Sequence, residues 1–271
     1  MEEDSLLNKL VANLDRYKQE NAKQHINLIK WFLSLIKYAL EEKNYKNKKI
    51  KYWSYTRGNI VKVNFGFNVG YEIGGVHYAI VMNNNDSIYS GTLNVIPLTS
   101  KKDSKNIYPH DIDLDDEFYQ HVEHKLDATL RTLNIHDIYH EKTRMEIQEI
   151  SELYPDTEFQ IDKEFSEKFR NTCTHLSLSF GTKITSQKMI ELLNEREQFY
   201  RKEVESYKNL HNELHYMKSG SIAKVNQFTT ISKQRIVSPT KKYHALNNIK
   251  LFDATIDKIN DKMKELYIFD K

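Results

Sequence analysis

Residues 57–75 read Arg-Gly-Asn-Ile-Val-Lys-Val-Asn-Phe-Gly-Phe-Asn-Val-Gly-Tyr-Glu-Ile-Gly-Gly, and this stretch decides the fold. Apolar and polar residues alternate in the second half of 57–65, which predicts a β-strand there. Five of the chain's eight glycines lie between residues 58 and 75. Glycine is needed where φ is positive or where the backbone approaches another group closely. We therefore expect a specialised loop over 66–75, although two ordinary β-turns would also account for the glycines.

Short strand patterns continue on both sides of a long helical stretch. Strands are predicted at 76–82, 92–98 and 107–114, and again at 220–228 and 229–237. Helical periodicity covers 5–43, 122–140, 141–153, 160–170, 186–217 and 251–267, and the polar stretch Gln19–Gln24 could divide the first helix in two. The simplest interpretation is an α+β fold with a small antiparallel barrel or sheet. We expect three parts: an N-terminal helical extension (1–50), a β domain (51–114 plus 219–271) and a mostly helical insertion (115–218) that ends in a long helix.

Two long predicted helices carry near-heptad apolar stripes. Leu7, Leu10 and Leu14 begin the stripe of the N-terminal helix, and Ile190 and Leu193 begin that of the helix over 186–217. The two helices could pair as an antiparallel coiled-coil arm. The alternative is that each helix packs on a different surface.

Composition excludes several classes of protein. The single cysteine, Cys173, excludes a disulfide framework and fits a reducing, cytoplasmic location. The sequence has no 18-residue apolar run, and its acidic first residues do not resemble a signal peptide. The net charge of +2 hides an asymmetry, because residues 219–250 carry six basic residues and no acidic ones, whereas 115–218 carry 14 basic and 21 acidic residues. A basic segment of this kind hints at a polyanionic partner.

Three blocks of the sequence resemble the MazF/PemK (Kid-type) toxin family of type II toxin–antitoxin systems. The first block is Arg57–Val61 with the loop Gly70-Tyr-Glu-Ile-Gly-Gly75, similar to the family pattern R-G-D-(I/V) followed by G-x-E-x-x-G. The second is Ala79–Met82 with Val95–Ser100 and Tyr108–Ile112, and the third is Val225–Arg235, with a C-terminal helix after it. The resemblance covers less than half of the chain.

The resemblance implies an SH3-like β-barrel, a homodimer and a cognate antitoxin protein as partner. It also implies an endoribonuclease that cuts single-stranded RNA at short sequences without a metal or other cofactor. In that reaction the 2′-hydroxyl attacks the adjacent phosphate and leaves a 2′,3′-cyclic phosphate and a 5′-hydroxyl. The enzyme must accept one proton, donate another and stabilise charge on the phosphate.

The resemblance places three catalytic candidates on this sequence. Thr99 matches the family's strand-end Thr or Ser, where it would bond to the scissile phosphate. The family's catalytic Arg falls on His77, a departure from the pattern, and histidine can serve as acid, base or phosphate ligand near neutral pH. Glu72 matches the loop Glu, as a proton acceptor or as a residue that organises the loop. The change at His77 leaves open an RNA- or protein-binding module that does not cut, and the coiled-coil arm leaves open a dimerisation scaffold.

The remaining candidates would bind RNA. Positive charges would contact phosphates, which makes binding salt-dependent, and aromatic rings would stack on bases. For Arg235 a structural ion pair is an equal alternative. The candidates are Arg57, Asn64, Phe67, Lys101, Lys102, Gln227, Lys233 and Arg235.

Paired histidines at metal-like spacing are the last motif. His136 and His140 are four residues apart, as are His211 and His215, and His121 and His124 are three apart. None of these pairs forms H-E-x-x-H. We therefore predict no metal site.

Overall fold

The computed structural model describes residues 2–45, 50–101, 107–155, 157–217, 220–242 and 244–268. The chain divides into two compact units. The first unit comprises Met1–Phe118, Lys218–Lys242 and Leu246–Lys271, and the second comprises Tyr119–Met217 and Tyr243–Ala245. The N-terminal helices therefore belong to the same unit as the sheet.

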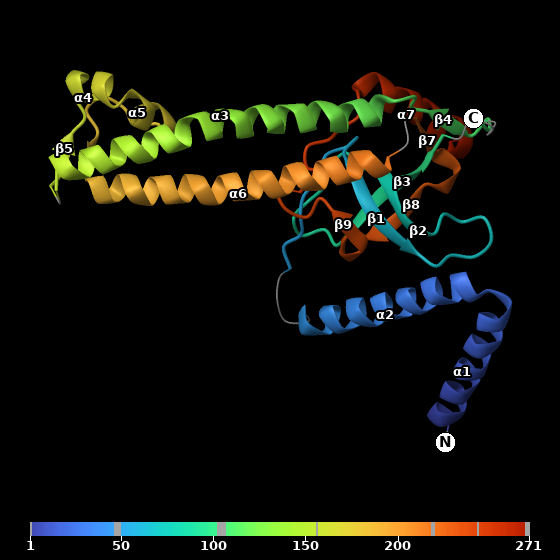
Figure 1. Ribbon diagram of the computed structural model, residues 1–271. Helices are drawn as coiled ribbons and strands as arrows, with labels where there is room; N and C mark the ends of the chain where they lie inside the picture. The colour runs from blue at the N-terminus through green and yellow to red at the C-terminus, as the bar shows by residue number, and fades with distance from the viewer. Residues whose placement is uncertain are drawn as a thin grey trace. The chain divides into compact units, whose positions relative to one another are not determined.

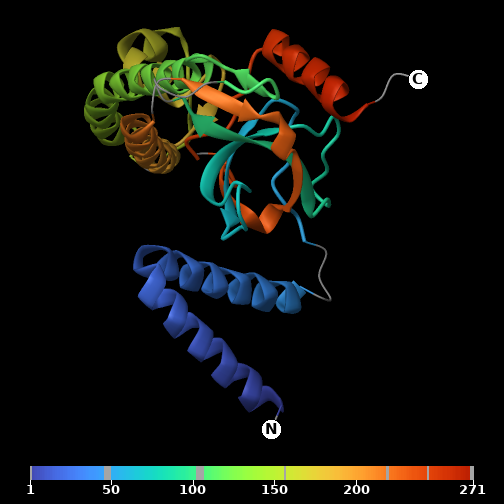
Figure 2. The ribbon, with the colours of Figure 1, turned by 90° about the vertical axis from the view of Figure 1, so that its right-hand side faces the viewer.

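The first unit is built on one antiparallel sheet (Figures 1 and 2). Its strands are β1 (Ile60–Gly66), β2 (Gly75–Val81), β3 (Thr92–Ser100), β4 (Asp111–Asp113), β7 (Ser221–Lys224), β8 (Thr229–Ser232) and β9 (Ile236–Ser238). They follow the order β4-β7-β3-β2-β1-β9, and β8 pairs with β3. The strands on either side of the long insertion thus share one sheet, which confirms the predicted α+β fold with a helical insertion. Among the described residues β4 and β9, the two ends of this order, do not pair with each other.

Alternation along the strands builds the core of the sheet. Val61, Val63 and Phe65 point to one face of β1 and are almost fully buried. They join a cluster with residues from other strands and from the segment before β1: Tyr55, Ala79, Val81, Leu93, Val95, Ile231 and Ile236. The alternation read from the sequence at 57–65 therefore marks the inner face of the sheet.

Three predicted strands are shorter than expected. Residues 109–110 form a turn, and the Asp111 amide donates to the Tyr108 carbonyl (2.9 Å), so β4 begins only at Asp111. Downstream, 3₁₀ turns η1 (Val225–Gln227) and η2 (Lys233–Arg235) interrupt the strands after β7 and β8. The Ser232 hydroxyl accepts from the Gln234 amide (3.3 Å) at the start of η2.

Three helices belong to the first unit: α1 (Glu2–Glu20), α2 (Ala22–Tyr45) and α7 (Asp253–Tyr267). The predicted division of the N-terminal helix falls at Asn21. The lysine-rich run at 43–51 lies partly outside the described residues. None of the described helices is long and apolar enough to cross a membrane.

The second unit is a helical hairpin with a small cap. Helix α3 (Glu117–Leu153) and helix α6 (Ser186–Tyr216) lie side by side (Figures 1 and 2). Between them come β5 (Phe159–Gln160), α4 (Lys163–Lys168), α5 (Arg170–Leu176) and β6 (Lys183–Ile184). The core of this unit comprises Ile147, Ile150, Ile161, Phe165, Phe169, Leu176, Ile184, Met189 and Leu193.

One prediction about the helices is wrong. The sequence pattern predicts a division at residue 140, whereas α3 runs through, and no Gly or Pro interrupts residues 117–153. For the helix over 186–217, the sequence leaves two arrangements open. Within the second unit α6 pairs with α3, where the Tyr200 hydroxyl donates to Asp137 Oδ1 (2.7 Å), and α1 and α2 belong to the other unit.

Candidate active site

The glycine-rich connection between β1 and β2 is a constrained loop. Gly66 and Gly75 pair across its base, and both have positive φ (85° and 83°), a region that favours glycine. Inside the loop, Asn68 Nδ2 donates to the Ile73 carbonyl (2.7 Å), and Asn64 Oδ1 accepts from the Gly66 amide (3.1 Å). Gly66 and Gly75 therefore allow the backbone conformation that this loop adopts.

Gln227 of η1, which is more than 150 residues away along the chain, binds the backbone of this loop. Its Oε1 accepts from the Ile73 amide (2.8 Å), and its Nε2 donates to the Tyr71 carbonyl (3.1 Å). Both groups of the amide are used, so Gln227 acts as a clamp on the loop. Its position beside Glu72 follows from these two bonds.

A groove of about 560 Å³ opens where the loop, β3 and η1 meet. Glu72 is exposed and lines it, and Gln227 and Arg235 lie on its wall, so three of the predicted site residues come together there. Tyr71, fully exposed at 101%, stands at its edge. The groove is lined by Phe65, Asn68, Tyr71, Glu72, Ile73, Pro97, Asn226, Gln227, Phe228, Thr229, Ile231 and Arg235.

His77 and Thr99 form a second part of the candidate site. The register of the β2–β3 pair, Ala79 with Pro97, extrapolates to His77 opposite Thr99. The His77 ring supports this, because its Nδ1 lies 3.2 Å from the carbonyl oxygen of Leu98. Alternation places both side chains on the same sheet face as Pro97, which lines the groove. His77 and Thr99 themselves are not among the groove's lining residues.

Arg235 is anchored rather than free. Its Nε donates to the Asn64 carbonyl (2.9 Å), and a second nitrogen donates to the Phe65 carbonyl. The guanidinium also lies over the Trp31 ring of α2, 5.0 Å from the ring centroid. Burial lowers the pKa of Arg235. This side chain therefore joins η2 to β1 and α2 while one side of it faces the groove.

Comparison with protein families bears on this arrangement. Residues 56–166 match the family described as PemK-like, MazF-like toxin of type II toxin–antitoxin system. These residues are similar to a PemK-like toxin, and the first unit, which holds the sheet, is called the PemK-like domain below. The matched residues hold β1–β4, His77 and Thr99, and they end inside the second unit. No curated protein matches the chain. The family supports a toxin function of the endoribonuclease type in general terms.

The loop of the PemK-like domain has a second cavity on its other side, of about 790 Å³. Helices α1 and α2 provide one wall, and the predicted residues Asn64 and Phe67 lie on the other. The Phe67 ring meets the Tyr17 ring edge-on, with centroids 6.3 Å apart. Asn64 and Phe67 are thus separated from the Glu72 groove and face the N-terminal helices.

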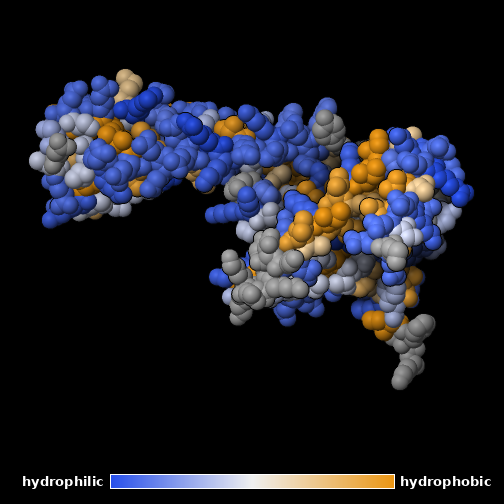
Figure 3. Space-filling view, turned by 90° about the horizontal axis from the view of Figure 1, so that it is seen from below, coloured by the Kyte–Doolittle hydropathy of each residue, from blue (hydrophilic) through white to orange (hydrophobic). Residues whose placement is uncertain are grey.

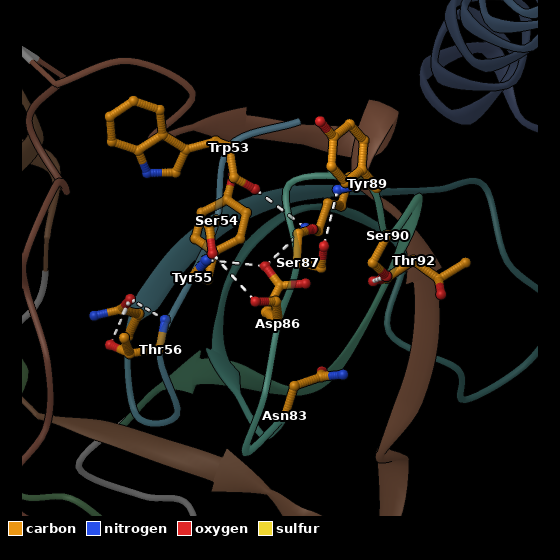
Figure 4. A network of polar contacts seen from close by, with 12 residues as sticks. Trp53, Ser54, Tyr55, Thr56, Asn83, Asp86, Ser87, Tyr89, Ser90 and Thr92 are labelled. Atoms are coloured by element: carbon orange, nitrogen blue, oxygen red, sulfur yellow. Dashed lines mark hydrogen bonds and ion pairs between the residues drawn. The ribbon is translucent and has the colours of Figure 1, made fainter. Parts of the chain in front are cut away.

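Lys233 corrects one prediction for the PemK-like domain, since it is not a surface phosphate contact. Its side chain is only 2% exposed and its Nζ lies 2.7 Å from Asp86 Oδ2, whose side chain is fully buried. The ammonium also donates to the carbonyls of Trp53 and Ser87 (3.1 Å each). Figure 4 shows Asp86 beside the segment that carries Tyr55, and the Tyr55 amide donates to the same carboxylate oxygen (2.9 Å). Lys233 therefore has a structural role, as the buried partner of Asp86.

Two more predicted cations are already engaged within the protein. Arg57 donates to the Met82 carbonyl, to Asn84 Oδ1 (3.0 Å) and to Asn260 Oδ1 of α7, and it lines a different cavity. Lys101 is paired with Asp113 and lies 3.4 Å from Asp115, and the hydrogen bond to Asp113 raises its pKa. Lys102 lies outside the described residues.

Sequence reasoning missed three residues of the site: Trp31, Asn68 and Tyr71. Tyr71 stands next to Glu72 within the motif, so its place on the loop was available as a signal. Asn68 lies in the same loop and could have been suspected as a turn-forming residue. Trp31 had only the signal that it is one of two tryptophans in the chain.

Proposed function

We propose that the PemK-like domain is an endoribonuclease that cuts single-stranded RNA at short sequences without a metal ion. The observation that carries the proposal is the extrapolated pairing of His77 with Thr99, inside the matched range 56–166 and on the sheet face that leads to the Glu72 groove. A toxin of this kind acts in the cytoplasm and is held inactive by an antitoxin protein, and we propose both for this chain.

His77 would carry the proton transfers. A proton on Nδ1 can be donated to the Leu98 carbonyl, which leaves Nε2 as the nitrogen that exchanges protons with RNA. The 2′-hydroxyl loses its proton as its oxygen bonds to phosphorus. The bond from phosphorus to the 5′ oxygen then breaks, and that oxygen takes up a proton. The products are a 2′,3′-cyclic phosphate and a 5′-hydroxyl.

Thr99 and Glu72 would assist in different ways. The Thr99 hydroxyl can donate to a phosphate oxygen and so stabilise the charge that develops there. Glu72, exposed in the groove, can accept the proton of the 2′-hydroxyl or hold a base by hydrogen bonding. Tyr71 at the groove edge offers a ring on which an unstacked base can lie.

The second candidate function is an RNA- or protein-binding module that does not cut. One observation favours it. Arg57, Lys101 and Lys233, which were predicted to bind RNA phosphates, all bind acceptors within the protein instead. Charge stabilisation at the phosphate would then rest on few groups, and His77 lacks the permanent charge of the family's arginine.

A cleavage assay with matched variants separates the two functions. A long unstructured RNA is incubated with the protein in EDTA, and 5′-hydroxyl ends are mapped. We expect defined cuts that fall by about 10²–10⁴-fold in His77→Ala and in Thr99→Ala. Thr92→Ala is the control, because Thr92 is exposed at the far end of the same strand.

The variant His77→Arg restores the family residue and decides between the candidates. An endoribonuclease that depends on histidine will cut less well as His77→Arg. Wild-type protein that binds the RNA without cutting, combined with cutting by His77→Arg, would instead establish the binding module.

A further inference from the structure

Three histidines of the second unit converge on one point. His136 and His140 are one turn apart on α3, and His175 lies in the last turn of α5. One ring nitrogen from each lies within 4.8 Å of the others. We propose that these histidines bind a divalent transition-metal ion, with Zn²⁺ as the representative ion. The proposal is independent of RNA cleavage, for which no metal is invoked.

The ring nitrogens are shielded from solvent and lack hydrogen-bond partners among the described residues. This holds for both nitrogens of His136, for Nδ1 of His140 and for Nε2 of His175. Buried polar atoms are rarely left unsatisfied, because the desolvation cost is not recovered. The rings contact one another instead, with centroids of His136 and His175 5.0 Å apart and of His136 and His140 5.1 Å apart. A shared cation would satisfy one nitrogen of each ring.

The surrounding structure holds the three rings in place. Glu146 of α3 accepts from Asn171 Nδ2 (2.5 Å) and from the amide and hydroxyl of Thr172 (2.7 Å each), which fixes α5 against α3. Tyr200 of α6 stacks on His136, with centroids 4.1 Å apart. The cluster is therefore built from three helices rather than formed by chance at an exposed surface.

The protonation state of the cluster suits a metal. Burial is the largest cause that lowers the pKa of His136 and of His175, the latter to about 4, and the neighbouring histidines lower both further. A lowered pKa favours the neutral form of His136 and His175, and neutral imidazole is the form that binds metals. The positive charge of Arg196 would repel a bound cation, whereas the negative charges of Asp137 and Glu197 would attract it.

The donor set selects the class of ion. Imidazole nitrogens suit Zn²⁺, Ni²⁺, Cu²⁺ and Fe²⁺ rather than Mg²⁺ or Ca²⁺. With Zn–N bonds of about 2.0–2.1 Å, tetrahedral ligand atoms lie about 3.4 Å apart. The ring nitrogens, now within 4.8 Å of one another, would therefore need to approach by up to about 1.4 Å. Three protein ligands leave a fourth position for water or an anion. A bound ion would join α3 to α5.

The test measures metal binding by the full chain. Metal-free protein is titrated with Zn²⁺ by calorimetry, and with Co²⁺, whose visible absorption reports tetrahedral coordination. We expect one ion per chain and a rise in the melting temperature on binding. His175→Ala should weaken Zn²⁺ binding by about 100-fold or more, because one of three ligands is lost. His124→Ala is the control, an exposed histidine on the same helix.

Other outcomes would overturn the proposal. These are the absence of stoichiometric binding, equal affinity in His175→Ala and wild type, or equal loss in the His124→Ala control. Circular dichroism checks that His175→Ala remains folded. His140→Gln, which keeps a polar side chain at the site, is the second variant should His175→Ala unfold, and it must show the same loss of affinity.

Discussion

Lys233 and Asp86 form a buried ion pair whose role is structural. Replacing Lys233 by Met leaves the Asp86 carboxylate buried without its counter-charge, and the carbonyls of Trp53 and Ser87 lose their donor. We expect the free energy of unfolding to fall by about 3–5 kcal/mol. Urea denaturation of the variant measures the fall.

The control for this prediction is the double variant Lys233→Met with Asp86→Asn. It removes both charges and should recover part of the loss, because no unpaired charge remains buried. A Lys233→Met protein with unchanged stability and weaker RNA binding would contradict the structural role and restore Lys233 as a phosphate contact.

Gly66 leaves the space that the Trp31 ring of α2 occupies. A Cβ built on Gly66 would lie 2.4 Å from two Trp31 ring atoms, and the backbone has φ of +85°. Gly66→Ala should therefore displace Trp31 and add backbone strain. Gly70 has φ of +63° and open space around its Cβ position, so Gly70→Ala carries backbone strain alone, about 1–2 kcal/mol. We expect Gly66→Ala to destabilise the protein more than Gly70→Ala does, as measured by urea denaturation.

A double-variant comparison isolates the contact with α2. In a Trp31→Ala background the steric part of the Gly66→Ala effect should vanish, and the two glycine substitutions should cost nearly the same. Unequal costs that persist without Trp31 would show that the ring is not what Gly66 accommodates.

At the scale of elements, helix α5 depends on a carboxylate from another helix. Its N-cap residue, Phe169, supplies no side-chain cap, and Glu146 of α3 takes that place by accepting from the Thr172 amide and hydroxyl. Thr172 is fully buried, so loss of the acceptor leaves buried donors unsatisfied. Glu146→Ala should lower the free energy of unfolding by about 2–3 kcal/mol.

Glu149 provides a matched control on the same helix. Its partner Lys168 lies 2.8 Å away, but both side chains are 51% exposed, so Glu149→Ala should change stability by less than about 1 kcal/mol. Similar losses in the two variants, measured by thermal or urea unfolding, would argue against the capping role of Glu146.

The strands and helices show which elements a sequence predicts well. The positions of β1, β2 and β3 follow from alternation, and those of α6 and α7 from helical periodicity and the absence of Gly or Pro. The partner of α6 did not follow, because near-heptad stripes occur on α1 and α2 as well and periodicity does not name a partner. The 3₁₀ turn η2 was also missed, since its residues continue a strand-like pattern.

At the scale of the whole molecule, the N-terminal helices carry a hydrophobic face. Figure 3, seen from the side of α1 and α2, shows a band of hydrophobic residues across it. The exposed residues of these helices include Leu6, Leu7, Leu10, Val11, Ile26, Leu33, Leu35, Ile36 and Leu40. A contiguous apolar surface is typical of a protein–protein interface.

The predicted homodimer gives this face a test. Light scattering should report about twice the chain mass of 32.2 kDa. Leu33→Glu should shift the protein to the monomer mass, because Leu33 is 62% exposed on this face and a buried charge would oppose association. Lys202→Glu, a charge reversal at an exposed lysine of α6 in the other unit, should leave the mass unchanged. A monomeric wild type would contradict the dimer.

Part of the candidate site could be predicted from the sequence. The resemblance located the glycine loop, Glu72, His77, Thr99, Gln227 and Arg235, because these residues fall in short motifs with local spacing. The burial of a side chain could not be predicted in the same way. Lys233 lies in a basic segment of the sequence, and the carboxylate that pairs with it in the structure, Asp86, is 147 residues away along the chain. His175 was missed for the same reason, since sequence spacing pairs His136 with His140 but not with α5.

The measurement that tests the central claim most directly is the chemistry of the RNA ends made by the wild-type protein in EDTA. Mass spectrometry of a short cleaved RNA should find a 2′,3′-cyclic phosphate on one fragment and a 5′-hydroxyl on the other, as attack by the 2′-hydroxyl requires. RNA that stays intact at protein concentrations that bind it, or fragments with 5′-phosphate ends, would contradict the account.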